Sequence, residues 1–196
     1  MPAIGVTGGI GTGKSSFVNC LRREMSDAAF FDADEYARHL VRDPAVAAEI
    51  RTLFGPQVFT RTEELNREAL RAIIFAEPAK RLALEEILHP RIRNRWSAEA
   101  QRYRNTTQIF VADIPLLYET SGESLCSKVV VVACAEELQL ARVMQRMQLS
   151  KADALAMIAT QLPLEEKIRR ADYVIWNNGP LSLLAKQAAK LARSWK

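Results

Sequence analysis

Residues 8–15, Gly-Gly-Ile-Gly-Thr-Gly-Lys-Ser, restrict the fold of this chain more than any other part of its sequence. They match the pattern G-x-x-x-x-G-K-[ST], directly follow the apolar run 4–7 and open the amphipathic segment 16–25. The glycines let a loop backbone wrap closely around phosphate oxygens, and the N–H groups at the start of the next helix point inward. The motif therefore predicts a strand, a phosphate-binding loop and a helix, in that order.

The motif also gives each loop residue an expected role. We expect Lys14 to bridge the β and γ phosphates of a nucleotide, and the Ser15 hydroxyl to bind Mg²⁺, which prefers hard oxygen ligands. The residues that we expect to bind the nucleotide are Gly9, Gly11, Thr12, Gly13, Lys14 and Ser15, together with Ser16, which follows the motif. The alternative is a chance glycine-rich turn, which the strand and helix patterns on either side disfavour.

Short apolar runs that alternate with helical patterns predict the fold class. These runs show no polar alternation, as expected for parallel strands that helices cover on both faces. The predicted strands are 3–7, 28–31, 109–112, 128–133 and 173–176. We therefore expect an α/β fold with three layers and a five-stranded parallel sheet.

The segment between Asp34 and Gln108 contains no convincing strand pattern. Its amphipathic stretches 36–54, 65–75 and 78–88 indicate an inserted helical lobe. Pro90 is expected in the first turn of a further helix, where its missing N–H costs nothing. Near the C-terminus, Leu184, Ala188, Leu191 and Trp195 recur at helical spacing and predict a helix packed on the sheet.

Length and composition set limits on the class of protein. A chain of 196 residues with 48% hydrophobic and 26% charged residues fits one globular domain with an inserted lobe. The net charge of +4 suits a nucleotide as well as nucleic acid, and no basic tail favours nucleic acid. Three cysteines without C-x-x-C spacing indicate neither a disulfide framework nor a zinc site. The sequence shows neither a secretory signal nor a membrane-spanning run, so we expect a cytoplasmic protein.

Two carboxylates follow the second predicted strand. Alternation at period two would direct Asp32 and Asp34 to the same side at the carboxyl end of this strand, where ligands of open α/β sheets bind. One carboxylate is then expected to hold Mg²⁺ through water, while the other accepts the proton of an attacking hydroxyl. The alternatives are an N-cap role for Asp34 and a structural acceptor role for Asp32.

Asp113 ends the apolar run 109–112, which resembles a Walker B strand whose carboxylate reaches the Mg²⁺ shell. A tight turn at Pro115 is the alternative explanation for this carboxylate.

Arg142 and Arg146 lie four residues apart in the segment 136–147 and therefore share one predicted helix face. Two guanidinium groups there can clamp a polyphosphate, and a lid that carries them would exclude water. A solvated charged face is the alternative. Ser150 with Asp153 resembles a capping pair, so the segment 142–161 is predicted to be a helix, a break and a helix.

Two further segments are candidate ligand contacts. Pro90 is expected to hold His89 out of the helical conformation, and Arg91 and Arg93 follow it, so that this basic cluster can meet an anionic substrate. In the segment 176–179, Trp-Asn-Asn-Gly, an asparagine such as Asn178 can contact an adenine base. The alternatives are a solvated helix start and an ordinary Asn-Gly turn.

In this order, the motifs resemble the dephospho-coenzyme A kinase family along nearly the whole chain. The resemblance rests on Thr7–Ser15, Asp32-Ala33-Asp34 with Ala37-Arg38, His89-Pro90, Asp113–Glu119, Arg142 with Gln145-Arg146, Gln161, Ala171–Ile175 and Asn177-Asn178-Gly179.

The resemblance implies a P-loop kinase of three parts. These are a core of about 1–35, 105–135 and 170–196, a helical substrate lobe of about 36–104, and a lid of about 136–169 that closes over ATP. It implies phosphorylation of the ribose 3′-hydroxyl of dephospho-coenzyme A, the last step of coenzyme A synthesis, with ATP and Mg²⁺ as cofactors. We expect no nucleic-acid or membrane partner, and a monomer or a small homo-oligomer.

The resemblance also implies roles for single residues. Asp34 matches the general base, Lys14 and Arg142 act with it in catalysis, and Ser15 and Asp113 bind the metal. Arg142, Arg146 and Asn178 join the loop in binding ATP. The expected substrate-binding residues are Thr7, Asp32, Asp34, Arg38, His89, Arg91 and Leu117.

Two positions depart from the family pattern: Met157, where many members carry Arg, and Trp176, where an acidic residue is common. The first affects the number of lid cations and the second affects contacts near the adenine.

Two other functions fit the motifs less well. One is a different small-molecule P-loop kinase, and the other is a nucleotide-binding switch, against which stands the lack of an Asn-Lys-x-Asp sequence.

Overall fold

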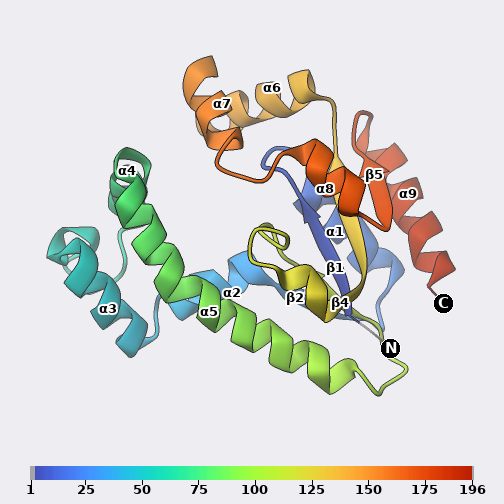
Figure 1. The fold of residues 1–196 in the computed structure, drawn as a ribbon, viewed down its shortest axis with the longest axis horizontal. Helices are drawn as coiled ribbons and strands as arrows, with labels where there is room; N and C mark the ends of the chain where they lie inside the picture. Colours follow the sequence, from blue (N-terminus) through green and yellow to red (C-terminus); the bar gives the residue numbers. More distant parts are fainter. Residues whose placement is uncertain (1–2, 196) are drawn as a thin grey trace. The chain divides into compact units, whose positions relative to one another are not determined.

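The computed structural model, which describes residues 3–195, contains a parallel sheet of five strands (Figure 1). The order across the sheet is β2-β3-β1-β4-β5, so β1 lies between β3 and β4. The strands are β1 Ala3–Gly8, β2 Ala29–Asp32, β3 Phe110–Asp113, β4 Cys126–Ala133 and β5 Tyr173–Trp176. The predicted α/β fold with five parallel strands is confirmed, and each strand boundary lies within two residues of the prediction.

In the sequence β4 follows β3, but in the sheet β1 lies between these two strands. The order of the strands therefore reverses beside β1. In open α/β sheets, ligands bind outside the carboxyl ends of the strands at such a point. The loop after β1 begins at this end of the sheet, because β1 ends at Gly8 and five residues separate it from the helix α1 Lys14–Glu24.

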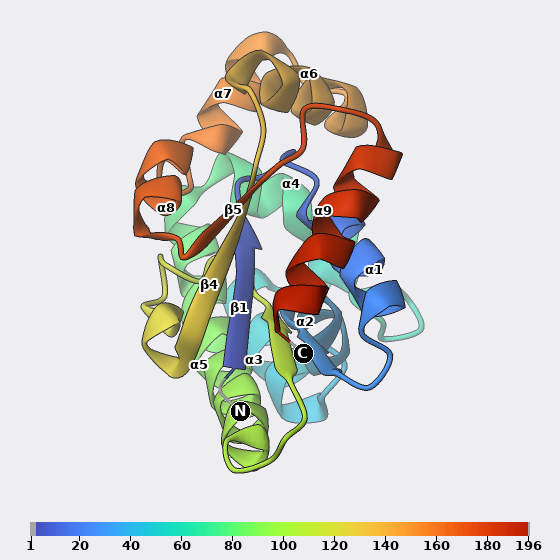
Figure 2. The ribbon, with the colours of Figure 1, turned by 90° about the vertical axis from the view of Figure 1, so that its right-hand side faces the viewer.

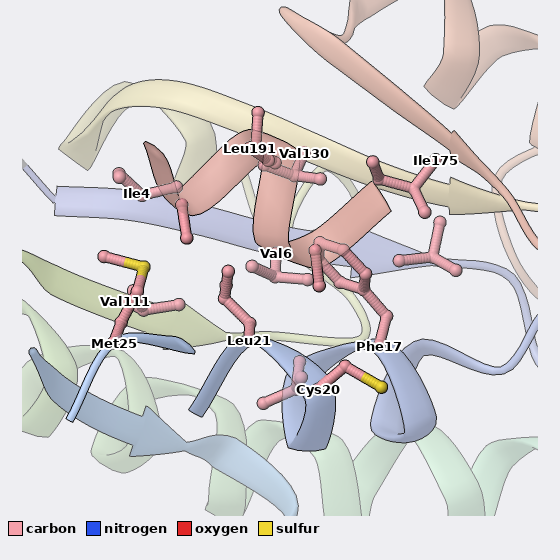
Figure 3. Close-up of a cluster of buried hydrophobic side chains, with 14 of the residues drawn as sticks. Ile4, Val6, Phe17, Cys20, Leu21, Met25, Val111, Val130, Ile175 and Leu191 are labelled. Carbon is pink, nitrogen blue, oxygen red and sulfur yellow. The ribbon is translucent and has the colours of Figure 1, made fainter. Parts of the chain in front are cut away.

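Two helices that are far apart in sequence, α1 and α9 Leu181–Ser194, pack against each other beside the sheet (Figure 2). Their apolar sides join the buried faces of the strands in one core, shown in Figure 3. Phe17 and Leu21 of α1 are fully buried there with Val6 of β1 and Val130 of β4. This packing fixes the start of α1, which carries the end of the glycine-rich loop. The helical spacing predicted for the C-terminal segment is confirmed by the burial of Leu184, Ala188 and Leu191.

The other helices of the first unit follow β4. These are α6 Glu136–Met147, α7 Lys151–Ile158 and α8 Leu164–Arg170. Ser150 caps α7 by accepting a hydrogen bond from the Asp153 N–H at 3.2 Å. The predicted helix, break and helix in this segment are therefore confirmed.

The chain divides into two compact units. The first holds the residues up to Asp32 and those from Ala98 onward, and the second is Ala33–Ser97. Taken by itself, the second unit is helical and buries its own core, which includes Val46, Ile50 and Leu84. Its elements are α2 Ala33–Leu40, α3 Pro44–Phe54, the 3₁₀ turn η1 Pro56–Val58, α4 Arg67–Ala76 and α5 Pro78–Tyr103, whose last residues belong to the first unit.

The prediction that Pro90 begins a separate helix is wrong. Pro90 lies inside α5, which runs without a break from Pro78 to Tyr103. Proline removes one helical hydrogen bond and crowds the preceding turn. Here the Arg91 side chain donates a hydrogen bond to the Ile87 carbonyl at 2.7 Å in that turn, and Leu84 and Trp96 are buried on either side. Packing of the helix therefore outweighs the local preference of proline to end it.

Cys20, Cys126 and Cys134 are all free, as the cysteine pattern predicts. Among the helices of residues 3–195, none is both long and apolar enough to cross a membrane.

Asp172, just before β5, ties this edge strand to β4. Its carboxylate accepts a hydrogen bond from the Val129 N–H at 2.8 Å and one from Lys128 Nζ at 3.0 Å. Burial acts to raise the pKa of Asp172, but these two partners lower it, and the pKa lies below the ordinary value of 3.8. The stabilisation is therefore complete above pH 3.8 and is lost as the pH falls through the pKa of the folded state.

We expect Asp172→Asn to lower the Tm at pH 7 by about 2 °C, since the ion pair is exposed to solvent. The difference from the wild type should shrink as the pH falls, because protonation of the wild-type carboxyl removes the same negative charge. Thermal unfolding followed by circular dichroism at a series of pH values measures this difference, with Asp27→Asn as the control. A difference that stays constant or grows as the pH falls would contradict this assignment.

Candidate active site

The loop between β1 and α1 has a backbone that only glycine tolerates at two positions. Gly11 and Gly13 have φ values of +79° and +89°, in the left-handed region. A Cβ atom on Gly13 would also lie 2.1 Å from Nδ2 of Asn177, so the close approach of this amide excludes any side chain. The Thr12 N–H and hydroxyl both donate to the Gly9 carbonyl, at 3.2 and 2.8 Å, and close the turn.

Lys14, the first residue of α1, forms an ion pair with Asp113, the last residue of β3. Their side chains are only 11% and 4% exposed. Asp113 pairs in register with Val6 of β1 and with Asp32 of β2, so the two acidic residues end neighbouring strands. The structure thus brings together Lys14 and Asp113, which the sequence predicts as a phosphate ligand and a metal ligand. Ser15 and Ser16 follow in α1 with exposed side chains.

Arg142 in α6 reaches the loop that follows β5. Its Nη2 donates to the Asn177 carbonyl at 3.0 Å. Its Nη1 is buried and has no hydrogen-bond partner among residues 3–195. A buried guanidinium N–H group without an acceptor is costly, and a phosphate oxygen would satisfy it. The other predicted lid cation, Arg146, lies one turn further along α6 and is exposed.

Cys134 lies beside Arg142. Burial raises the pKa of the Cys134 thiol, although the Arg142 guanidinium opposes the shift. The thiol is therefore neutral at physiological pH and supplies no negative charge to Arg142.

Asn178 and Trp176 lie on either side of Asn177. The side-chain oxygen of Asn178 accepts the Ala135 N–H at 2.8 Å, which ties this turn to the start of α6. Trp176 is 48% exposed and so does not fill the core. The adenine contact of Asn178 stays a prediction.

Thr7 and Leu117, both predicted to contact substrate, are fully buried. The Thr7 hydroxyl donates to the Pro115 carbonyl at 3.0 Å, which links the end of β1 to the segment after β3. A Cβ atom on Gly5 would lie 2.8 Å from Cδ2 of Leu117, so Leu117 packs directly on β1. In this structure both residues support the strand that leads into the loop.

The remaining predicted residues belong to the second unit. Asp34 is the second residue of α2 and is exposed. The alternation argument for Asp32 and Asp34 is wrong, because β2 ends at Asp32 and the helix begins at Ala33. Asp34 is not an N-cap either, since it lies within the first helical turn, where a negative charge stabilises the helix dipole.

Arg38 lines a cavity of about 610 Å³ in the second unit. The cavity is basic at Arg38, His39, Arg42 and Arg67, and acidic at Glu63 and Glu64. The expectation that Pro90 holds His89 out of a helix is wrong, because His89 lies within α5. Arg91 binds Glu49 at 2.5 Å and the Ile87 carbonyl, so its guanidinium is occupied within the unit.

Several residues next to the loop carry no sequence signal for the contacts they make. Gln139 of α6 is only 4% exposed and donates to the Ile10 carbonyl at 2.8 Å. Gln161 accepts the Ile10 N–H at 2.8 Å, and Lys167 and Asn177 are also buried beside the loop. A polar residue on the apolar face of a predicted helix is a weak signal for Gln139. Nothing local distinguishes Lys167 within the charged run 165–170.

These residues fit a nucleoside triphosphate with a bound metal ion. The loop offers the glycine turn, the Lys14 ammonium and the free Nη1 of Arg142 within one unit. Within the described part of the chain, no group of three or more metal-binding side chains is present. In kinases Mg²⁺ takes one or two protein ligands and the rest from phosphate and water, so Ser15 and Asp113 are the candidate ligands.

Together, the parallel sheet and the glycine-rich loop with Lys14, Asp113 and Arg142 define a P-loop kinase. A shikimate kinase from Bacteroides thetaiotaomicron shares this fold, with a TM-score of 0.54 and 14% identity over 98% of this chain and 96% of that chain.

The comparisons with known proteins are more specific than the fold. The family model of dephospho-CoA kinase matches residues 2–182. A dephospho-CoA kinase of Bacillus cereus is 39% identical over 98% of this chain and 96% of its own length. One of Anaeromyxobacter dehalogenans is 42% identical over 97% and 90%. A solved dephospho-CoA kinase from Campylobacter jejuni has a TM-score of 0.73 and 28% identity over 98% and 96% of the two chains. The chain belongs to the dephospho-CoA kinase family.

Variants of the buried ion pair between Lys14 and Asp113 separate its contribution to stability from its contribution to ATP binding. We expect Lys14→Met to lower the free energy of unfolding by about 3 kcal/mol, because it removes the cation from the buried Asp113 carboxylate. The double variant Lys14→Met/Asp113→Asn should recover most of this loss, since the buried charge is also removed. Neither variant should bind ATP tightly.

Urea unfolding and ATP titration of the two variants measure these effects. Lys128→Met is the matched control, because its ion pair with Asp172 is exposed and should contribute little. A Lys14→Met protein as stable as the wild type would contradict the account of this pair.

Proposed function

We propose that the protein transfers the γ-phosphoryl group of ATP to the ribose 3′-hydroxyl of dephospho-coenzyme A, giving coenzyme A and ADP. The observation that carries the proposal is the loop with Lys14 and the unsatisfied Arg142 guanidinium, in a chain that matches the family over nearly its full length.

The loop residues 9–16 would hold the phosphates of ATP, with the Lys14 ammonium between the β and γ groups. The Ser15 hydroxyl and the Asp113 carboxylate would hold Mg²⁺, which neutralises charge on the phosphate oxygens when it is bound. Lys14 pairs with Asp113, so its ammonium group is held at the start of α1.

Arg142 and Arg146 would stabilise the charge that develops on the transferred group. A loose phosphoryl-transfer state needs positioning and electrostatic stabilisation more than covalent assistance. Arg142 suits this role because the Asn177 carbonyl fixes one arm of its guanidinium and leaves the other free. We propose that the segment 136–169, which includes α6 and α7, acts as the lid.

Asp34 would accept the proton of the attacking 3′-hydroxyl. Its support is its place in the motif Asp32-Ala33-Asp34, its exposure, and the helix that fixes it two residues after β2. The helical lobe of about 36–104 would receive dephospho-coenzyme A, and its Arg38 and His89 would contact the anionic substrate. We propose that Asn178 lies near the adenine of ATP.

The reaction is tested by measuring ADP release with ATP and Mg²⁺ in the presence of dephospho-coenzyme A, AMP, shikimate or no acceptor. We expect turnover with dephospho-coenzyme A alone, and a product with the mass of coenzyme A. Turnover with another acceptor would contradict the substrate, and hydrolysis that does not depend on an acceptor would favour a nucleotide-binding switch.

The base is tested by Asp34→Asn, which keeps the size of the side chain but cannot accept the proton as a carboxylate does. We expect kcat to fall about 10²- to 10⁴-fold with the affinity for ATP nearly unchanged. Glu35→Gln, at the neighbouring exposed acid of α2, is the matched control and should keep its activity. Wild-type turnover by Asp34→Asn would show that another group is the base.

A further inference from the structure

Three carbonyl groups at alternate positions of the loop segment are held by side chains from three different elements. Lys167 of α8 donates to the Gly8 carbonyl at 3.3 Å, and Gln139 of α6 donates to the Ile10 carbonyl at 2.8 Å. Asn177, directly after β5, donates to the Thr12 carbonyl at 2.9 Å. We call Lys167, Gln139 and Asn177 the carbonyl clamp.

The clamp determines where the next N–H groups point. A trans peptide unit is planar, so its C=O and its N–H point in opposite directions. The described residues contain no cis peptide bond. Holding the carbonyls of Ile10 and Thr12 therefore directs the N–H groups of Gly11 and Gly13 away from Gln139 and Asn177.

The N–H groups of Gly11 and Gly13 have no hydrogen-bond partner within residues 3–195. Both residues also have positive φ values, so the clamp holds a backbone that is strained for other residues. The loop thus presents unfilled donors on the side opposite the clamp, as an anion site requires.

Each clamp residue is itself fixed. The side chain of Lys167 is 0% exposed, and its ammonium also binds Glu119 at 2.8 Å and the Pro115 carbonyl at 3.4 Å. Gln139 and Asn177 are 4% and 8% exposed. Buried polar groups with satisfied hydrogen bonds have little freedom, so they can hold the carbonyls in one orientation.

We propose that Gln139 and Asn177 are positioning residues for phosphoryl transfer, which orient the Gly11 and Gly13 N–H groups toward the β-phosphate of ATP. Lys167 supports the same arrangement at the start of the loop. The inference rests on the proposed function, because it takes ATP as the ligand of this loop. It adds that parts of the lid segment, α6 and α8, shape the phosphate site through its backbone before any nucleotide binds.

If Gln139 and Asn177 contributed only to stability, their loss would weaken the binding of all nucleotides to the same extent. The positioning role instead predicts a loss that depends on the β-phosphate. Gln139→Met tests it, because methionine is unbranched and of similar length but cannot donate to the Ile10 carbonyl. Asn177→Leu is the second variant, at the Thr12 carbonyl.

The matched control is Gln187→Met. Gln187 also donates to a backbone carbonyl, that of Trp176 at 2.9 Å, but this carbonyl lies outside the loop. Calorimetric titration of AMP and ADP into the full-length wild type and the variants separates the two roles. We expect Gln139→Met to weaken ADP binding about three- to tenfold and to leave AMP binding unchanged. Gln187→Met should change neither affinity.

The proposal is overturned if Gln139→Met and Asn177→Leu bind ADP like the wild type. It is also overturned if the variants lose affinity for AMP and for ADP by the same factor. Should Gln139→Met fail to fold, Asn177→Leu carries the same test. A wild-type protein that binds neither ADP nor ATP would overturn the proposed function itself, a result that differs from one confined to the variants.

Discussion

The loop that joins β1 to α1 must turn within five residues and leave its N–H groups free for an anion. Side chains at Gly11 and Gly13 are excluded by the left-handed backbone, and at Gly13 also by the amide of Asn177. The rest of the first unit provides the surroundings that this turn requires. The fully buried Phe17 and Leu21 hold α1 on the sheet, and α6 lies against the loop through Gln139.

The charged side chains around the loop differ in whether they have a partner. Lys14 is paired with Asp113, and the buried Lys167 is paired with Glu119, so an acidic partner compensates the charge of each of these two cations. Arg142 differs, because its neighbour Cys134 is a neutral thiol and its buried Nη1 has no acceptor among the described residues. A buried N–H group without an acceptor costs free energy that a phosphate oxygen would return.

Much of the fold could be predicted from the sequence, because its signals are local. Apolar runs without alternation marked all five strands, and the spacing of Leu184, Ala188 and Leu191 marked α9. The prediction that a helix begins at Pro90 was wrong because the packing of Leu84 and Trp96 along α5 outweighs the preference of proline to interrupt a helix. The period-two argument for Asp34 failed because a helix starts immediately after β2, and no strand propensity shows where that change occurs. Gln139, Asn177 and Lys167 lie 129, 165 and 159 residues from the carbonyls they bind, so no local pattern could reveal these contacts.

We expect the loop to receive the β-phosphate of the nucleotide without rearrangement. A crystal structure with ADP and Mg²⁺ tests this expectation. The β-phosphate should lie within hydrogen-bond distance of Lys14 Nζ and of the Gly11 and Gly13 N–H groups, with the carbonyls of Gly8, Ile10 and Thr12 still bound as they are here. A phosphate bound elsewhere, or a loop whose carbonyls have turned away from Lys167, Gln139 and Asn177, would contradict it.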